Sequence, residues 1–242
     1  MSEPIRIFIG TSANNEDADS EMVLEYSLRK NASQPIDITW MKQTHDTSSI
    51  WHGWKTNRWS TPFSGYRWAI PEACGFKGRA IYMDEDMVNL RDISDLYNIN
   101  MDGKPLGART GVRFGGHEFC VIVFDCAAME KHLVPVNRMK PNVDAHHRYI
   151  HTFSGSDTVF NIDPRWNCHD GDGRQLDDIW HLHYTKMATQ PWRPAWFIGK
   201  HEDHPRKDLV EFWHNMKQEA LSNGYSPQIT NQSPINYSII GQ

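Results

Sequence analysis

Three consecutive acidic residues, Asp84, Glu85 and Asp86, follow directly on the apolar residues 81–83. Burying even one unpaired carboxylate costs several kcal/mol, so this run either ends a strand in water or faces a cation. Alternate side chains of an extended chain point the same way, so Asp84 and Asp86 can converge while Glu85 points elsewhere. Two converging carboxylates suit a hard divalent cation that also holds phosphate oxygens. These residues by themselves leave both interpretations open.

The elements that would position the triplet alternate between strand and helix. Residues 5–10 and 35–41 are short apolar runs typical of buried strands. Between them, residues 14–31 carry acidic residues early and basic residues late, which favours a helix. Residues 78–86 continue as a third core strand that ends at the triplet. This order predicts an α/β sheet, and ligands of such sheets bind beyond the carboxyl ends of the strands.

The rest of the chain is predicted from the same signals. Turn residues and polar runs indicate a long loop over 42–65 and irregular structure over 135–180. The remaining elements are expected to be helices at 65–76, 92–99, 126–134 and 208–223, and strands at 105–110, 119–126 and 178–185.

Composition excludes several classes of protein. The net charge is −5 and no more than two basic residues are consecutive, so a nucleic-acid partner is not expected. The four cysteines form no CxxC pair and are expected to be reduced thiols of a cytoplasmic protein. No run approaches eighteen apolar residues and no signal peptide precedes the first strand, so no membrane span is expected.

The run KGRAIYMDEDMVNLRDISDLYNI, residues 77–99, resembles the DxD region of nucleotide-sugar glycosyltransferases with the GT-A fold, most closely those of family 8. Asp84 and Asp86 take the two DxD positions. The resemblance implies a Rossmann-like, mostly parallel sheet flanked by helices over residues 1–200. Residues 201–242 would be a C-terminal helical extension and tail of the same domain.

Two further segments resemble the parts of that family that bind the donor nucleotide. IRIFIGTSANNED resembles the first strand and uridine-binding loop, which implies that Thr11, Ser12 and Ala13 lie near the nucleoside. SGYRWAIPEACGFKGRA resembles the helix before the DxD strand, which implies that Arg67 helps to hold the nucleotide. Glu85, between the two aspartates, is counted with this donor-binding set.

WHLHYTKMATQPW resembles the C-terminal HYxGxxKPW motif of the family. The resemblance implies that His183 is a third metal ligand beside Asp84 and Asp86. Lys186 stands where the motif has Gly, and Thr189 and Gln190 stand where it has Lys. The diphosphate grip of the usual Lys would then pass to Lys186.

Two carboxylates are the candidate catalytic residues. SDTVFNIDPRWN resembles a segment with a catalytic-site Asp ahead of a PxxWN turn, and Asp157 is the match. HEFCVIVFDC resembles a strand that usually reads NSGVMLFN, but it departs from that pattern at Glu118, Phe119 and Cys120. Family 8 enzymes retain the anomeric configuration, so Asp157 would position the sugar. If the enzyme inverts instead, Asp157 or Glu118 is the candidate general base.

The resemblance thus implies a glycosyltransferase that depends on Mn²⁺ or Mg²⁺ and acts in polysaccharide biosynthesis. Its donor would be a UDP-sugar, and its acceptor a glycan or a lipid-linked sugar, which leaves room for peripheral membrane contact. The cation would stabilise the leaving diphosphate. An alternative is a GT-A module that binds a nucleotide sugar or glycan without turnover, because the sequence departs from the family at 118–120 and 186–190.

Other motifs in the sequence are weaker evidence of function. Residues 111–124, with His117 in place of the acid, are similar to the GGDEF signature of diguanylate cyclases, a remote alternative that lacks the other acidic strand of that fold. We expect a tight glycine turn leading into a strand there. Residues 168–178 do not fit a calcium loop, and His201 and His204 are expected in a wet surface loop. The tryptophans of residues 51–68 would either pack in the core or stack on sugar rings.

Overall fold

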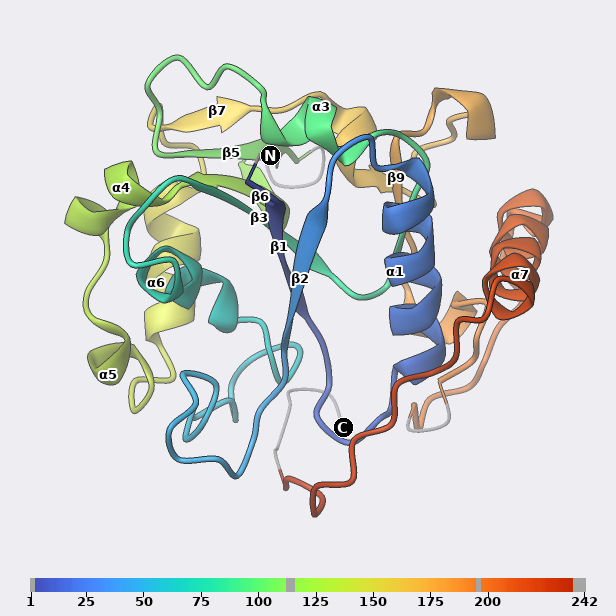
Figure 1. Cartoon of the computed structure of the whole chain (residues 1–242), viewed down its shortest axis with the longest axis horizontal. Coiled ribbons are helices and arrows are strands. Elements are labelled where there is room, and N and C mark those ends of the chain that lie inside the picture. Colours follow the sequence, from blue (N-terminus) through green and yellow to red (C-terminus); the bar gives the residue numbers. More distant parts are fainter. Residues whose placement is uncertain (1–2, 112–115, 195–196, 237–242) are drawn as a thin grey trace.

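Six strands form a mixed central sheet in the computed structural model, which describes residues 3–111, 116–194 and 197–236. The strands are β1 Ile5–Gly10, β2 Ile36–Met41, β3 Arg79–Asp84, β5 Leu106–Thr110, β6 His117–Asp125 and β7 Val159–Asn161. Their order across the sheet is β2-β1-β3-β6-β5-β7 (Figure 1). β1 is parallel to β2 and β3, and β5 is parallel to β7, whereas β6 is antiparallel to β3 and β5. The predicted α/β class with a mostly parallel sheet is confirmed.

A small second sheet begins where the acidic triplet ends. It comprises β4 Met87–Asn89, β8 Cys168–His169 and β9 His181–His183, with β9 in the middle. β4 pairs with β9 in antiparallel register, so that Met87 lies opposite His183. The chain therefore passes from the central sheet to the small sheet through Glu85 and Asp86. The triplet and His183 meet at this junction.

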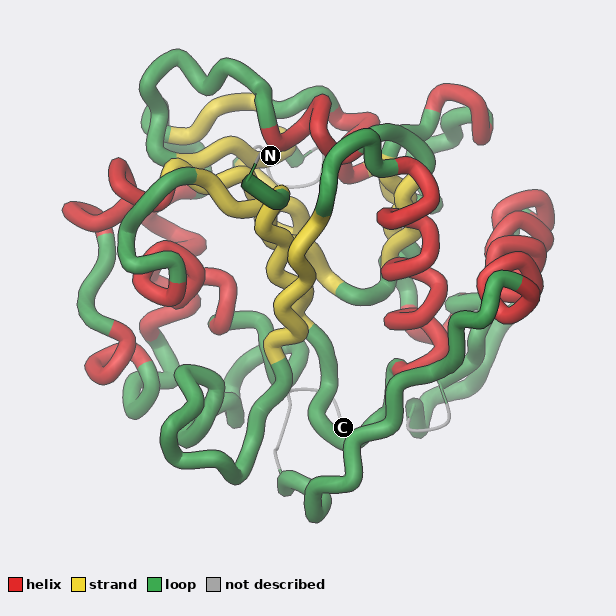
Figure 2. The backbone as a smooth tube through the Cα atoms, viewed as in Figure 1, coloured by secondary structure: helices red, strands yellow, loops and turns green. Residues whose placement is uncertain are grey.

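Helices lie on both sides of the central sheet (Figure 2). They are α1 Ala18–Asn31, α2 Ile70–Ala73, α3 Ile93–Tyr97, α4 Cys126–Met129, α5 Val136–Met139, α6 Ala145–Phe153 and α7 Lys207–Ser222. The side chains of β1 alternate between two cores, because successive residues of a strand point to opposite faces. Ile7 and Ile9 pack with Leu24 of α1, whereas Phe8 packs with the tryptophan-rich loop and α6.

The loop predicted over 42–65 has no regular helix or strand, as expected. Its three tryptophans, Trp51, Trp54 and Trp59, are nonetheless buried around the ring of Tyr66. Trp68 is buried against Phe119 and Phe153 in the same core, so these rings are not open to a sugar. These tryptophans lie outside any apolar run of the sequence, yet they form part of the hydrophobic core beneath this loop.

The expectation of irregular structure over 135–180 is wrong for residues 136–161, which contain α5, α6 and β7. Helix α6 reads AHHRYIHTF, and its apolar residues Ala145, Tyr149 and Phe153 recur every fourth position on one face. The interspersed histidines obscure this period in the sequence. The glycine turn expected at the start of the GGDEF-like stretch falls on residues 112–115, outside the described residues, and the strand after it is β6.

The C-terminal helix is confirmed as α7, which packs on α1 through Leu209, Trp213 and Met216. After α7 the chain runs back towards the end of β1 (Figure 1). There the backbone of Thr230 and Ile235 is hydrogen-bonded to side chains of the loop that follows β1. Every described helix is too short or too polar to span a lipid bilayer.

Candidate functional site

Asp84 is the last residue of β3 and lies opposite Gly10, the last residue of β1. A Cβ atom on Gly10 would stand 2.7 Å from the Phe63 ring and 2.9 Å from the Tyr82 hydroxyl. Such distances are shorter than van der Waals contact, so only glycine at position 10 lets the side chains of Phe63 and Tyr82 approach the end of β1. The sequence IFIG thus ends β1 with the residue that leaves space beside Asp84.

Arg67 and Tyr82 surround the Asp84 carboxylate. Arg67 Nη2 lies 3.3 Å from Asp84 Oδ1, and the guanidinium stacks on the Tyr82 ring at 4.4 Å from its centroid. The Tyr82 hydroxyl donates to Asp84 Oδ1. Burial raises the pKa of Asp84 above its usual range, and Arg67 opposes this rise. The predicted donor-binding Arg67 is therefore placed as the charge partner of the first DxD aspartate.

Asp86 and His183 form the second half of the cluster. His183 Nε2 lies 3.2 Å from Asp86 Oδ1, and Gln190 Nε2 donates to Asp86 Oδ2 at 3.2 Å. On its other side, His183 Nδ1 lies 3.1 Å from Asn167 Oδ1, so Nδ1 carries the proton and Nε2 faces the carboxylate. Although burial alone lowers the pKa of His183, the neighbouring Asp86 raises it above the usual value.

Cys120 is a member of this cluster that the sequence analysis did not propose. One ligand atom each of Asp84, Cys120 and His183 lie within 4.8 Å of one another, a spacing that a metal ion can bridge. Burial and the Asp84 carboxylate raise the pKa of the Cys120 thiol well above its usual value. The only sequence signal was the departure from the family pattern at residues 118–120.

Glu85, between the two aspartates, lines the same pocket as Asp84 and Asp86. Its side chain is buried, and burial together with the nearby Asp17, Asp86 and Asp84 carboxylates raises its pKa well above the usual value. Its Oε2 has no hydrogen-bond partner among the described residues. Burial and the neighbouring carboxylates thus favour the neutral form of Glu85.

A pocket lies over the triplet, and its space of about 410 Å³ includes open solvent. The pocket has an acidic floor and walls from the loops before α2 and after β9. Its lining residues are Ser12, Thr61, Pro62, Phe63, Asp84, Glu85, Asp86, Met187 and Gln190.

The other predicted donor-binding residues are placed unequally. Ser12 lines the pocket, whereas the Thr11 hydroxyl is occupied by Glu21 at 2.7 Å and Ala13 is buried. Lys186 is exposed and forms an ion pair with Glu202. The lysine that was expected to grip a diphosphate is thus paired with Glu202 and is not among the residues that line the pocket.

Glu118 lies near the cluster but is already paired. It precedes Cys120 by two residues of β6, and its Oε2 is 3.1 Å from His169 Nε2 and 3.5 Å from Arg109 Nε. His169 in turn packs edge-on against His183, with ring centroids 5.3 Å apart. Burial raises the pKa of Glu118, but His169 and Arg109 outweigh it, so the pKa is lowered overall.

Asp157 does not join the site. It is exposed in the turn before β7. Val159, the first residue of β7, pairs with Leu106 of β5, and Leu106 pairs with Phe124 near the end of β6. Phe124 in turn pairs with Ala80 at the start of β3. Asp84 stands at the opposite end of β3. β7 runs towards the level of Asp84, so Asp157, which precedes β7, lies at the opposite end of the sheet.

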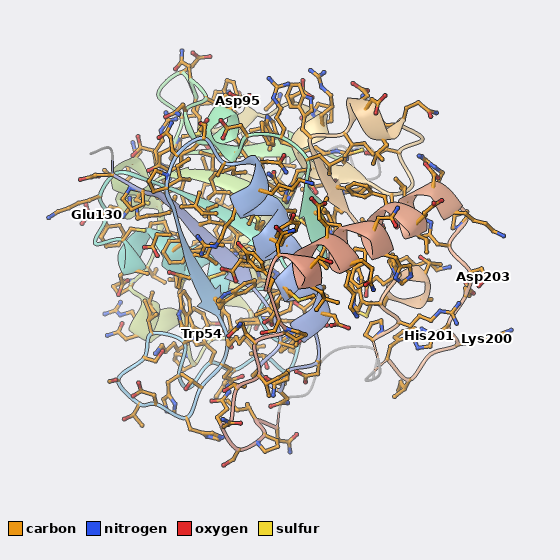
Figure 3. All side chains as sticks on the ribbon, turned by 45° about the vertical axis from the view of Figure 1, so that its right-hand side comes forward. Trp54, Asp95, Glu130, Lys200, His201 and Asp203 are labelled. Atoms are coloured by element: carbon orange, nitrogen blue, oxygen red, sulfur yellow. The ribbon has the colours of Figure 1, made fainter. Side chains whose placement is uncertain are left out.

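The two histidines expected in a wet surface loop differ from each other. His204 is buried, and its Nε2 lies 3.0 Å from Asp170 Oδ2, so the expectation is wrong for this residue. His201 lies with Lys200 and Asp203 at the outer edge of the molecule (Figure 3). The pair therefore does not converge on one site.

Comparison with solved structures identifies the fold. The chain is similar to the bifunctional glycosyltransferase WbbM (TM-score 0.63, 12% identity), covering 92% of this chain and 52% of WbbM. It is similar to the galactosyltransferase LgtC solved with donor and acceptor sugar analogues (TM-score 0.60, 13% identity), covering 89% of this chain and 96% of LgtC. For GlyE of Streptococcus pneumoniae the TM-score is 0.60 at 14% identity, with 94% and 66% covered.

No protein-family model matches the sequence, and no curated protein is similar to it. The chain spans about half the length of WbbM and nearly all of LgtC. At these identities the likeness concerns the fold, which is the GT-A fold of the sugar-transferring enzymes. The predicted GT-A architecture is confirmed, while the likeness does not separate family 8 from other GT-A families.

Proposed function

We propose that the protein is a glycosyltransferase that takes a sugar from a nucleoside-diphosphate donor. One observation carries this proposal: Asp84, Asp86 and His183 converge beside a pocket at the strand ends of a GT-A fold. Ligands of open α/β sheets bind at this edge. The expected metal is a divalent cation, because two carboxylates and an imidazole suit such an ion.

The residues around the cluster supply orientation and charge. A divalent cation held by Asp84, Asp86 and His183 would neutralise the charge that develops on the leaving diphosphate. Gln190 and Asn167 hold Asp86 and His183 by hydrogen bonds, so the ligand geometry is fixed before the donor binds. Phe63 and Met187 in the pocket walls would exclude water from the reacting carbon.

The finer features of the proposal are a UDP-sugar donor, a glycan or lipid-linked acceptor, and retention of configuration. Ser12 in the pocket supports a nucleoside near the loop after β1. Retention is favoured over inversion because neither predicted base is positioned for that role. Glu118 is ion-paired with Arg109 and His169, and Asp157 lies at the far end of the sheet.

The test is calorimetric titration of UDP and of GDP into the protein, first with Mn²⁺ and then with EDTA. We expect binding of one nucleotide that needs the metal and that Asp86→Ala abolishes without loss of the fold. The matched control is Asp95→Ala, because Asp95 is an exposed aspartate paired with Arg91 away from the pocket. Unchanged metal-dependent binding by the Asp86 variant would refute the proposed role of the cluster.

The second candidate function is a GT-A module that binds a nucleotide sugar without turnover. The observation that favours it is the ion pair of Lys186 with Glu202, which leaves the diphosphate without the expected lysine. Release of UDP from a panel of UDP-sugars, with and without acceptor glycans, separates the two functions. Metal-dependent UDP binding with no UDP release from any donor would favour the binding module.

A further inference from the structure

We propose that Cys120 binds the same cation as Asp84 and His183 through its sulfur, and that this thiolate makes the site select Zn²⁺ or Co²⁺ over Mg²⁺. The inference rests on the metal site of the proposed function and adds a ligand and a metal preference to it. It differs from the expectation of Mn²⁺ or Mg²⁺, which considered only the two carboxylates and the imidazole.

The ends of β3 and β6 bring Cys120 near Asp84. The two strands are antiparallel, and their pairing ends with Met83 opposite Val121. Asp84 follows Met83 and Cys120 precedes Val121, so both residues lie directly beyond the last paired position. A carboxylate oxygen of Asp84 and the sulfur of Cys120 lie within 4.8 Å of each other.

The third ligand comes from the small sheet. His183 is at the end of β9, and the hydrogen bond from its Nδ1 to Asn167 leaves Nε2 to face the cluster. Metal-binding histidines typically have such a partner on the other ring nitrogen. Asn167 is fully buried, and its Nδ2 has no hydrogen-bond partner among the described residues. Burying this unpaired amide nitrogen costs folding free energy.

The donor atoms then decide which metal fits. Oxygen, nitrogen and sulfur ligands from Asp84, His183 and Cys120 match the ligands that Zn²⁺ takes in proteins, with Asp86 beside His183 as a further oxygen. Mg²⁺ prefers an octahedron of oxygens and gains little from sulfur. The thiol loses its proton when the metal binds, as in other cysteine sites.

Titration of Co²⁺ into the purified protein, followed by absorption spectroscopy, tests the thiolate directly. Ligand-field bands in the visible region report that Co²⁺ is bound, and a near-ultraviolet charge-transfer band reports a Co²⁺–sulfur bond. We compare the wild type with Cys120→Ser and with the control Cys74→Ser, because Cys74 lies with Cys126 elsewhere in the fold. Calorimetry with Zn²⁺ and Mg²⁺ runs in parallel.

We expect the charge-transfer band in the wild type and in Cys74→Ser, and its loss in Cys120→Ser. Zn²⁺ affinity should fall at least about 10-fold in Cys120→Ser, while Mg²⁺ affinity stays unchanged. Bound Co²⁺ without the band, or a band that survives in Cys120→Ser, overturns the inference. If UDP still needs Mn²⁺ in that case, the proposed function stands. Failure of Co²⁺ to bind at all overturns the inference. If UDP binding is then also independent of any metal, the proposed function is overturned too.

Discussion

The orientation of His183 depends on one amide at the residue scale. Asn167 Oδ1 accepts the hydrogen bond of His183 Nδ1, so the other ring nitrogen faces Asp86 and Cys120. Asn167 lies in the WN pair of the segment DPRWN, which the motif analysis had linked only to Asp157. Its place beside the histidine of the proposed metal site follows from the pairing of the small sheet.

Replacing this amide should therefore weaken metal binding without touching a ligand. We predict that Asn167→Ala lowers divalent-metal affinity about 10- to 100-fold, because the imidazole loses its fixed tautomer and orientation. Calorimetric titration of Zn²⁺ or Mn²⁺ measures the effect. Asn161→Ala, an exposed asparagine on β7, is the control and should leave the affinity unchanged. Equal affinities for the wild type and Asn167→Ala would show that the amide does not orient the ligand.

Arg67 and Asp84 form a buried ion pair whose two members are both less than 15% exposed. We predict that Arg67→Met lowers the free energy of unfolding by about 3 kcal/mol, because it leaves the Asp84 carboxylate buried without its partner. Adding Asp84→Asn should recover part of that loss. Urea denaturation of both single variants and the double variant measures the coupling, and simple additivity would contradict a direct pair.

Some residues of the site could be predicted from the sequence. These are the residues that lie in one short motif or at the end of one strand. Asp84 and Asp86 follow from the alternation after β3, and the structure brings them together with His183. Cys120 and Asn167 could not be predicted, because their places depend on strand register and on a second sheet that no local pattern indicates. Metal binding by these residues stays a prediction.

At the scale of elements, the ends of β1 and β3 pack as closely as they do because Gly10 has no side chain. We predict that Gly10→Ala lowers the free energy of unfolding by about 1–3 kcal/mol, since the new methyl group forces Phe63 and Tyr82 apart. Thermal or urea denaturation measures the loss. Gly171→Ala is the matched control, because a Cβ there meets no atom within 4 Å. Equal losses at the two glycines would mean that the strand ends have room to spare.

Helix α6 brings a buried histidine against the tryptophan-rich loop. The Trp68 Nε1 group donates to His146 Nδ1 at 3.1 Å, and burial, with Arg67 and His147 nearby, lowers the pKa of His146 to about 2. An unfolded histidine has a pKa of about 6.5. Between these values the unfolded chain binds the additional proton, so the stability contributed by neutral His146 is present above pH 6.5 and is lost as the pH falls.

We predict that the free energy of unfolding falls by up to about 1.4 kcal/mol per pH unit below pH 6.5 through this residue alone. His146→Gln keeps an acceptor for Trp68 and removes the titration, so it should flatten the dependence between pH 6.5 and pH 5. Urea denaturation at several pH values measures the slopes. His147→Gln, the exposed neighbour, is the control. Parallel slopes for the wild type and His146→Gln would contradict the prediction.

The elements differ in how well the sequence foretells them. Continuous apolar runs marked β1, β3 and β6, because strands buried on both faces need apolar side chains on both. Helix α6 was missed because five polar residues, three of them histidines, separate its apolar positions. The buried tryptophans of the 42–65 loop were ambiguous, because burial of a loop is decided by what packs above it and not by its own period.

At the scale of the whole molecule, the C-terminal segment 227–236 fastens the loop that follows β1. Asn15 exchanges two hydrogen bonds with the backbone of Thr230, at 2.7 and 3.0 Å, and Asn14 does the same with Ile235, at 2.8 and 3.0 Å. Gln232 adds a bond to the carbonyl of Ala13 at 3.3 Å. This loop also contains Ser12, which lines the pocket. Residues more than 200 positions apart thus meet beside the proposed nucleoside site.

Truncation after Ser226 should free this loop while leaving the fold intact, because Tyr225 still packs on Tyr26 and α7 still packs on α1. We predict faster hydrogen exchange over residues 11–16 and a UDP affinity about 5- to 10-fold lower, since binding must then order side chains that the tail now holds. Exchange mass spectrometry and calorimetry measure the two effects. Asn14→Ala, which removes the Ile235 pair alone, should give a smaller change of the same sign. Unchanged exchange in the truncated protein would show that the loop is rigid without the tail, whereas faster exchange with unchanged UDP affinity would place the nucleoside away from residues 11–13.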